Sequence, residues 1–262
     1  MKNYLISVII RTVGRESLEQ AINSVITQTY KNIEIIVVED NGKKCEERCH
    51  AFNDERIKYY NTGASLGRVK AGNLALTKAT GDYLIFLDDD DEFLPTHLAT
   101  LIAKVDGENI VYSFAYEVGI NKELNLKTKP YILQEYYPQE YLYFFNLFPI
   151  NTVLFPKKAY DELGGFEENI EMLEDWILWA KYGFKYKFIS SDYITAIYTV
   201  PFGLKSYFKR HFMIKKYFNQ ASDLINKLSK NAPISIQKID FLSRIKRKFK
   251  VVYILFKARL DT

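Results

Sequence analysis

The sequence has few of the residues that hold zinc or build thiol and histidine catalytic sites. It contains two cysteines, Cys45 and Cys49, and three histidines, His50, His97 and His211. Two cysteines four residues apart, with no second cysteine or histidine pair, do not complete a four-ligand zinc site, so we expect free thiols. No histidine lies in a recognisable motif, which leaves no Ser-His-Asp or Cys-His arrangement to support. The low cysteine count and the lack of a signal peptide predict a reducing compartment.

The sequence also lacks a membrane-spanning segment and the common nucleotide-binding motifs. None of its apolar runs approaches the roughly 18 residues that a membrane-spanning helix needs. No G-x-G-x-x-G follows the first expected strand and there is no G-x-x-x-x-G-K-[ST] loop, which disfavours a dinucleotide-binding domain and a P-loop. What remains is a chain of 262 residues with 48% hydrophobic residues, enough for one large domain or one domain with an appendage.

Charge divides the chain into two regions. Residues 1–202 carry a net charge of −8, whereas residues 203–262 carry +12. We therefore expect a body over 1–202 and a basic, amphipathic helical tail over 203–262, which would meet an anionic surface such as a membrane. Helices that only pack on the acidic body are the alternative. Nucleic-acid binding is not expected, because no nucleic-acid motif accompanies the charge.

The first 120 residues alternate between strand and helix patterns. Apolar β-prone runs predict strands, and apolar residues at helical spacing predict helices between them. This alternation indicates an α/β fold with a mostly parallel sheet. The expected strands are 5–10, 33–38, 57–60 and 83–87, and the expected helices are 18–26 and 67–79. After residue 120 the sequence predicts strands at 151–155, 186–190 and 193–199, and helices at 157–163 and 174–182.

Four consecutive aspartates, Asp88 to Asp91, follow the apolar run Tyr83 to Leu87. Like charges this close are costly unless a cation or hydrogen-bond donors hold them. Ligands of open α/β sheets bind at the carboxyl ends of strands, and oxygen ligands suit Mg²⁺ or Mn²⁺. The run therefore predicts a metal site. A solvated acidic turn before a helix near Pro95 is the alternative.

Short motifs in this order resemble family 2 glycosyltransferases. They are Ser7-Val8-Ile9-Ile10-Arg11-Thr12, Ser24 to Tyr30 with the Ile-Glu-Ile-Ile-Val-Val-Glu-Asp that follows, Leu87 to Asp91, Gly164-Gly165-Phe166 and Glu174-Asp175-Trp176. The resemblance extends over residues 5–185. It implies a GT-A fold, a nucleotide-sugar donor, a divalent metal and inversion at the anomeric carbon. It also divides the body into a nucleotide-sugar half, 1–120, and an acceptor-side half, 121–202.

On the donor side, the resemblance implies that Asp88 and Asp90 hold the metal as a D-x-D motif. Asp89 and Asp91 also read as D-x-D, so the register stays open, and Asp89 joins Asp88 among the expected donor-binding residues. The resemblance also places Asp40, at the end of the second strand, beside the nucleobase; a loop carboxylate that caps a helix near Lys43 is the alternative. Arg11 and Thr12 end the first strand and should line the same pocket. Arg68 would approach the base or the diphosphate as a fixed cation, with a solvated arginine as the alternative. Many relatives carry proline where Arg11 stands, which leaves the role of Arg11 open.

On the acceptor side, the resemblance implies that Asp175 is the general base, with Glu174 orienting a substrate or a neighbouring group. A carboxylate within reach of the acceptor hydroxyl would take its proton during attack. Acidic residues also favour the first turn of a helix, which is the structural alternative. Trp176 and Trp179 are expected in the core rather than as platforms for sugars.

Together these features predict a metal-dependent inverting glycosyltransferase. The donor would be a UDP-linked hexose or N-acetylhexosamine, and the acceptor a polyprenyl-diphosphate-linked saccharide in O-antigen or capsule synthesis at the inner face of the cytoplasmic membrane. The alternatives are a sugar-nucleotide nucleotidyltransferase, with Arg11 to Arg15 as a thin phosphate loop, and an inactive GT-A-fold binding protein. No pair of carboxylates indicates a retaining glycosidase.

Overall fold

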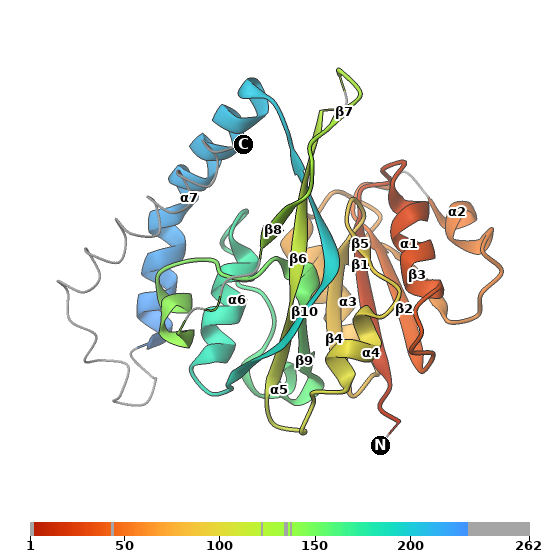
Figure 1. The fold of residues 1–262 in the computed structure, drawn as a ribbon, viewed down its shortest axis with the longest axis horizontal. Helices are drawn as coiled ribbons and strands as arrows, with labels where there is room; N and C mark the ends of the chain where they lie inside the picture. Colours follow the sequence, from red (N-terminus) through yellow and green to blue (C-terminus); the bar gives the residue numbers. More distant parts are fainter. Residues whose placement is uncertain (1–2, 43–44, 122, 134–135, 137, 230–262) are drawn as a thin grey trace.

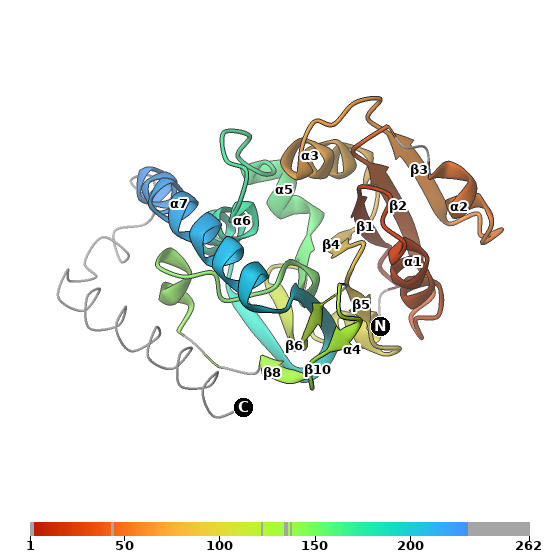
Figure 2. The same ribbon diagram turned by 90° about the horizontal axis from the view of Figure 1, so that it is seen from above.

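A mixed sheet whose longest pairings are parallel forms the centre of the fold, and helices cover both of its faces (Figures 1 and 2). The computed structural model describes residues 3–42, 45–121, 123–133, 136 and 138–229. Within them the sheet has ten strands in the order β3-β2-β1-β4-β9-β6-β10-β5, with β7 and β8 paired to β6. The predicted α/β fold is confirmed.

The first half of the sheet consists of the four predicted parallel strands. Neighbouring residues of β1 point to opposite faces, so Val8 and Ile10 pack on one side and Ile9 on the other. Both faces are covered, which explains the continuous apolar runs. The elements are β1 (Ile6–Thr12), α1 (Leu18–Ile26), β2 (Ile33–Glu39), α2 (Glu46–His50), β3 (Ile57–Asn61), α3 (Arg68–Lys78) and β4 (Tyr83–Asp88).

The second half of the sheet is interleaved with the first. Strand β9 (Val153–Pro156) lies between β4 and β6 (Ile110–Asn121), and β5 (Glu92–Phe93) pairs with β10 (Phe188–Pro201). The prediction of two strands at 186–190 and 193–199 is wrong. They are one strand, β10, whose register against β6 shifts between Ser190 and Ala196. The short strands β7 (Leu126–Lys127) and β8 (Tyr131–Leu133) complete the sheet.

The remaining helices flank this half. The start of the strand predicted at 151–155 is a 3₁₀ turn, Ile150–Thr152, and a second 3₁₀ turn spans Gln139–Tyr143. As predicted, Trp176 and Trp179 are core residues, 1% and 0% exposed. The helices are α4 (His97–Ile102), α5 (Lys157–Leu163), α6 (Glu174–Gly183) and α7 (Leu204–Ser229).

Helix α7 begins the basic tail and has two different surfaces. Tyr217, Ala221 and Ile225 are buried against α6, so this part of the tail packs on the body. Nearer its start, three apolar side chains at four-residue intervals remain exposed: Leu204 (79%), Phe208 (65%) and Phe212 (68%). We call these three residues the α7 stripe. Arg244, Lys246, Arg247 and Lys248, which the sequence places in the basic tail, lie outside the described residues.

No helix among the described residues combines the length and the hydropathy needed to cross a membrane. Cys45 and Cys49 are both buried free thiols, as predicted.

Candidate active site

The four aspartates after β4 alternate between open and buried positions. Asp88 and Asp90 are 26% and 36% exposed, whereas Asp89 and Asp91 are 0% and 2% exposed. The run forms a turn, in which the backbone carbonyl of Asp88 accepts a hydrogen bond from the N–H of Asp91 at 3.0 Å. Two carboxylates of the run therefore face outward and two face inward.

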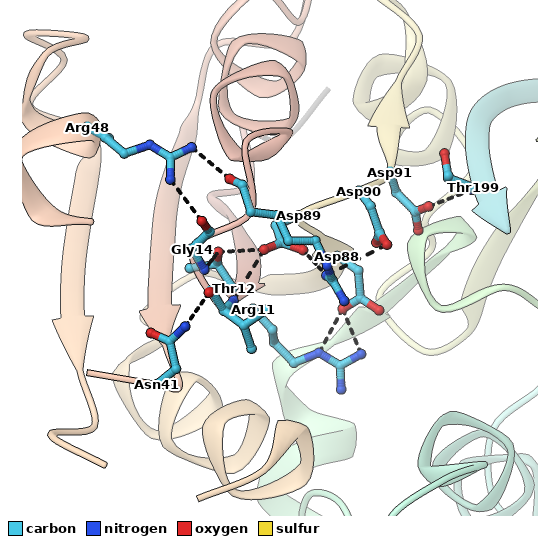
Figure 3. A network of polar contacts seen from close by, with 12 residues as sticks. Arg11, Thr12, Gly14, Asn41, Arg48, Asp88, Asp89, Asp90, Asp91 and Thr199 are labelled. Atoms are coloured by element: carbon cyan, nitrogen blue, oxygen red, sulfur yellow. Dashed lines mark hydrogen bonds and ion pairs between the residues drawn. The ribbon is translucent and has the colours of Figure 1, made fainter. Parts of the chain in front are cut away.

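Asp89 ties the acidic run to the loop after β1 (Figure 3). Its Oδ2 accepts hydrogen bonds from the hydroxyl of Thr12 at 2.6 Å and from the backbone N–H of Val13 at 3.2 Å. Its Oδ1 is paired with Arg15. Thr12 also accepts a hydrogen bond from the N–H of Gly14 at 2.8 Å. Thr12 and Asp89, both expected to bind the donor, are buried and bonded to each other, and their expected donor role stays a prediction.

Asp91 ties the run to the second half of the sheet. Its Oδ1 accepts a hydrogen bond from the N–H of Thr199 on β10 at 2.8 Å. Burial and the neighbouring Asp88 raise its pKa well above the ordinary value. Because Asp89 and Asp91 are buried whereas Asp88 and Asp90 are partly exposed, accessibility favours Asp88 and Asp90 as the D-x-D pair, and the register stays a prediction.

Asp90 is the most open carboxylate of the four. Its closest ion pair is with Arg15 at 3.7 Å. Burial raises its pKa, and the charges of Asp88 and Asp89 add to that effect, while Arg15 opposes it. A divalent cation would relieve this repulsion.

Arg11 joins the acidic run after β4 to the first turn of α6. Its Nε donates to Oδ1 of Asp88 at 2.9 Å, and its Nη1 donates to Oε1 of Glu174 at 3.1 Å. Burial alone would raise the pKa of Asp88, but the positive charges of Arg11 and Arg68 lower it below its ordinary value. Arg68, half exposed at the start of α3, lies 3.6 Å from the same Oε1 of Glu174. The structure therefore brings Arg11, Arg68, Asp88 and Glu174 together.

Asp40 lies at the end of β2 and organises the loop before α3. Its Oδ1 accepts hydrogen bonds from the backbone N–H groups of Leu66 at 2.7 Å and Gly67 at 3.1 Å. The preceding Glu39 is turned into the protein, where it accepts a hydrogen bond from the N–H of Cys45 at 3.1 Å. Asp40 rather than Glu39 is thus placed at the loop-forming end of the strand, and its expected role with the nucleobase stays a prediction.

Asp175 lies in the first turn of α6, next to Glu174. Its Oδ2 accepts a hydrogen bond from the side chain of Asn146 at 2.9 Å, and its Oδ1 accepts one from the N–H of Trp176 at 2.8 Å. Burial and the neighbouring Glu174 raise the pKa of Asp175 to about 6. A carboxylate with a pKa near 6 is a stronger base than an ordinary aspartate and is still ionised at neutral pH, which suits a general base. The preceding Leu173 has a left-handed backbone, with φ of 64°, a strained conformation of the kind found at functional sites.

The donor set fits a metal held jointly with a substrate. Among the residues that the structure describes, no three His, Cys, Asp or Glu side chains are grouped to hold an ion by themselves. Magnesium and manganese sites that bind nucleotides often use one or two carboxylates, with phosphate oxygens and water completing the shell. Asp88 and Asp90 would supply those carboxylates, and the bound ion would stabilise the charge that develops on a departing diphosphate.

Sequence reasoning missed several residues that shape this site. Arg15 holds Asp89, and Asn146 holds Asp175. Arg210 of the basic tail donates to the hydroxyl of Tyr198 at 3.1 Å. Burial raises the pKa of Tyr198, and the charges of Asp91 and Asp175 add to that effect, while Arg210 opposes it. Asn146 follows an aromatic-rich stretch without a periodic pattern, so no sequence signal could have identified it. Arg15 entered the sequence analysis only within the alternative phosphate loop and Arg210 only within the basic tail, because neither pairing has a local sequence signal.

The family model for glycosyl transferase family 2 matches residues 7–161, more than half of the chain. The chain therefore belongs to glycosyl transferase family 2. A Rickettsia typhi protein, an uncharacterized glycosyltransferase, is 31% identical over 68% of this chain and 58% of its own length. A Campylobacter jejuni GalNAc(5)-diNAcBac-PP-undecaprenol beta-1,3-glucosyltransferase is 39% identical over 46% of this chain and 40% of its own. The chain thus spans about half the length of these two relatives.

Solved structures show the same GT-A fold at low identity. Staphylococcus aureus TarS 1–349 in complex with UDP-GlcNAc matches with a TM-score of 0.68 and 18% identity, covering 87% of this chain and 67% of that chain. The mannosyltransferase PcManGT from Pyrobaculum calidifontis, in complex with GDP-Man and Mn²⁺, matches with a TM-score of 0.58 and 14% identity. The match to PcManGT covers 98% of this chain and 82% of that chain. These likenesses confirm the fold class that the sequence predicted.

Proposed function

We propose that this enzyme transfers a hexose or N-acetylhexosamine from a UDP-sugar, with inversion and with a divalent metal, to a polyprenyl-diphosphate-linked saccharide. The observation that carries the proposal is the pairing of two carboxylate centres in one site. Asp88 and Asp90 face outward at the end of β4, and Arg11 and Glu174 link them to Asp175, whose pKa is about 6.

The chemistry follows from this arrangement. Asp175 would accept the proton of the acceptor hydroxyl as the hydroxyl oxygen attacks the anomeric carbon, while the nucleoside diphosphate leaves from the opposite face. That geometry needs one base and one stabilised leaving group, and it gives inversion in a single displacement. Asn146 would hold the carboxylate of Asp175 in a fixed orientation, so that its free lone pairs face the acceptor.

The relatives support the choice of acceptor. The Campylobacter jejuni relative and an Escherichia coli relative, 32% identical over 47% of this chain and 50% of its own length, are named as glucosyltransferases acting on saccharides linked through diphosphate to undecaprenol. A role in O-antigen or capsule assembly at the inner face of the cytoplasmic membrane is part of the same proposal.

A panel of nucleotide sugars tests the donor. We expect one UDP-sugar to raise the melting temperature with MnCl₂ and to have little effect with a chelator. At a concentration of about 100 times Kd, a ligand that binds only the folded state adds about 2.7 kcal/mol to the free energy of unfolding. UDP-glucose, UDP-GlcNAc, GDP-mannose and a dTDP-sugar would be compared. Stabilisation by UTP with a sugar phosphate, but by no nucleotide sugar, would instead indicate a nucleotidyltransferase.

We further propose that the tail from residue 203 holds the enzyme on an anionic membrane, where such an acceptor lies. The α7 stripe and the basic residues around it have the composition of an interfacial helix. Each basic residue near an anionic surface contributes about 1 kcal/mol, so binding should weaken as salt rises.

Vesicle sedimentation tests the tail. Replacing Leu204, Phe208 and Phe212 together with serine should abolish co-sedimentation with phosphatidylglycerol vesicles at moderate salt. Glutamate at Arg244, Lys246, Arg247 and Lys248 should do the same, since it removes the electrostatic attraction. Tyr193→Ser, at another exposed aromatic residue, serves as the control and should bind like the wild type. A wild type that does not bind these vesicles, or variants that bind as well as it does, would leave the tail as ordinary packing.

A further inference from the structure

Arg11 occupies an unusual position for an arginine at the end of a central strand. It is only 5% exposed, and its guanidinium is shared by two carboxylates from distant parts of the chain. Nε lies 2.9 Å and Nη2 lies 2.8 Å from the same Oδ1 of Asp88, while Nη1 lies 3.1 Å from Oε1 of Glu174. One buried cation thus joins the strand that carries the acidic run to the helix that carries Asp175.

The protein provides a fitted slot for this side chain. The guanidinium carbon lies 5.5 Å from the ring centres of both Phe86 and Phe166. Gly72 of α3 closes the slot, because a Cβ there would come within 2.6 Å of the Phe166 ring and 3.4 Å of Cδ of Arg11. A planar guanidinium can contact both rings and both carboxylates at once, whereas the single ammonium group of lysine cannot.

Arg11 neutralises the two carboxylates that it contacts. Burial would lower the pKa of Arg11, but Asp88 and Glu174 outweigh burial and keep the guanidinium charged. Without it, the carboxylates of Asp88 and Glu174 would lose their nearest countercharge, and only the more exposed Arg68 and Arg15 among the described residues would remain close enough to act on Asp88. Glu174 precedes Asp175 directly, so any displacement of Glu174 moves the proposed base.

We propose that Arg11 is a positioning residue, which fixes the start of α6, and with it Asp175, relative to the donor-side Asp88 by pairing with Glu174. This inference rests on the proposed role of Asp175 as the base. Arg11 acts through Glu174 and does not itself touch the acceptor.

A double-mutant cycle tests this coupling. Arg11→Met fills the slot without the charge, Glu174→Gln keeps the shape of the glutamate, and the double variant removes both charges. If Arg11 acts through Glu174, each single change should lower kcat by about 100-fold, the loss expected from a displacement of about 1 Å. The kcat of the double variant should then be no lower than the kcat of the less active single variant. Arg11→Lys keeps the positive charge but not the planar set of N–H donors, so its kcat should be little higher than that of Arg11→Met.

Two further measurements separate positioning from mere stabilisation. The free energy of unfolding is measured for the wild type, Arg11→Met, Glu174→Gln and the double variant. These four values give the coupling of the two residues in stability and need no active enzyme. Donor affinity is measured with the stabilising UDP-sugar and MnCl₂, and is expected to fall less than kcat. Two results would overturn the proposal. In the first, the two changes are coupled in the free energy of unfolding, but the kcat loss of the double variant equals the product of the two single losses. In the second, the Arg11→Met protein has the kcat of the wild type per folded molecule. If Asp175→Asn retains full turnover, the proposed base fails instead, whatever the result of the cycle.

Discussion

Replacing Asp175 with asparagine is expected to lower turnover by about 100- to 10,000-fold while leaving UDP-sugar binding close to that of the wild type. Asparagine keeps the shape of the side chain and can still hydrogen-bond Asn146, but it cannot accept a proton. Steady-state kinetics with a synthetic polyprenyl-diphosphate saccharide, together with donor binding measured by calorimetry, would check both parts of this expectation.

The pH dependence of the wild type gives the same prediction an independent check. The pKa of Asp175 is raised to about 6, so the base is protonated below that pH and turnover should rise as pH increases through about 6. Because the folded-state pKa is raised, the ionised carboxylate costs stability above that pH, and Asp175→Asn should be no less stable than the wild type at neutral pH. Asp161→Asn, at an exposed carboxylate on α5, is the matched control and should keep wild-type turnover. An equal loss of donor affinity in Asp175→Asn would place this residue in the nucleotide pocket.

Replacing Asp90 with alanine is expected to reduce transfer by orders of magnitude and to weaken donor binding in manganese. Asp90 is the more exposed of the two outward carboxylates, and its nearest cation, Arg15, is 3.7 Å away and also paired with Asp89. The pKa of Asp90 is raised by burial and by its acidic neighbours, so its loss removes repulsion and should not destabilise the fold at neutral pH.

Manganese titration of donor binding checks the Asp90 prediction directly. Donor affinity of the wild type should depend on manganese, and that dependence should be much weaker in Asp90→Ala. Asp161→Ala again provides the control for the loss of one surface carboxylate. If transfer survives both Asp90→Ala and an excess of chelator, the enzyme does not use a metal at this run.

The parts of the fold that could be predicted from the sequence are those encoded by local patterns. Continuous apolar runs identified β1, β2 and β4, because strands covered on both faces need no polar alternation. The single strand β10 was read as two, because its register shift interrupts the pattern around Asp192, where the backbone is left-handed with φ of 69°.

Sequence reasoning named several residues of the candidate site but none of the pairings between them. The motif order placed Asp88, Asp90, Glu174 and Asp175 in the site, and the structure brings Asp88 and Glu174 together through Arg11. The division of the acidic run into open and buried members depends on Thr12, 77 residues before Asp89, and on Thr199, 108 residues after Asp91. Such long-range contacts leave no trace in a local pattern. Arg11 and Glu174, 163 residues apart, are the extreme case.

The interleaving of the sheet has a consequence for the order in which the protein can fold during synthesis. When β4 is synthesised, its neighbour β1 already exists, but its other neighbour, β9, begins only at Val153. Strand β5 must wait still longer, until β10 emerges after residue 188. A nascent chain that has reached residue 120 therefore presents an apolar, unpaired strand edge beside four aspartates. Exposed strand edges invite pairing with other chains, and the charges at the end of β4 are of the kind that discourages it. The same carboxylates that we assign to donor binding would thus reduce aggregation of the incomplete chain with other nascent chains.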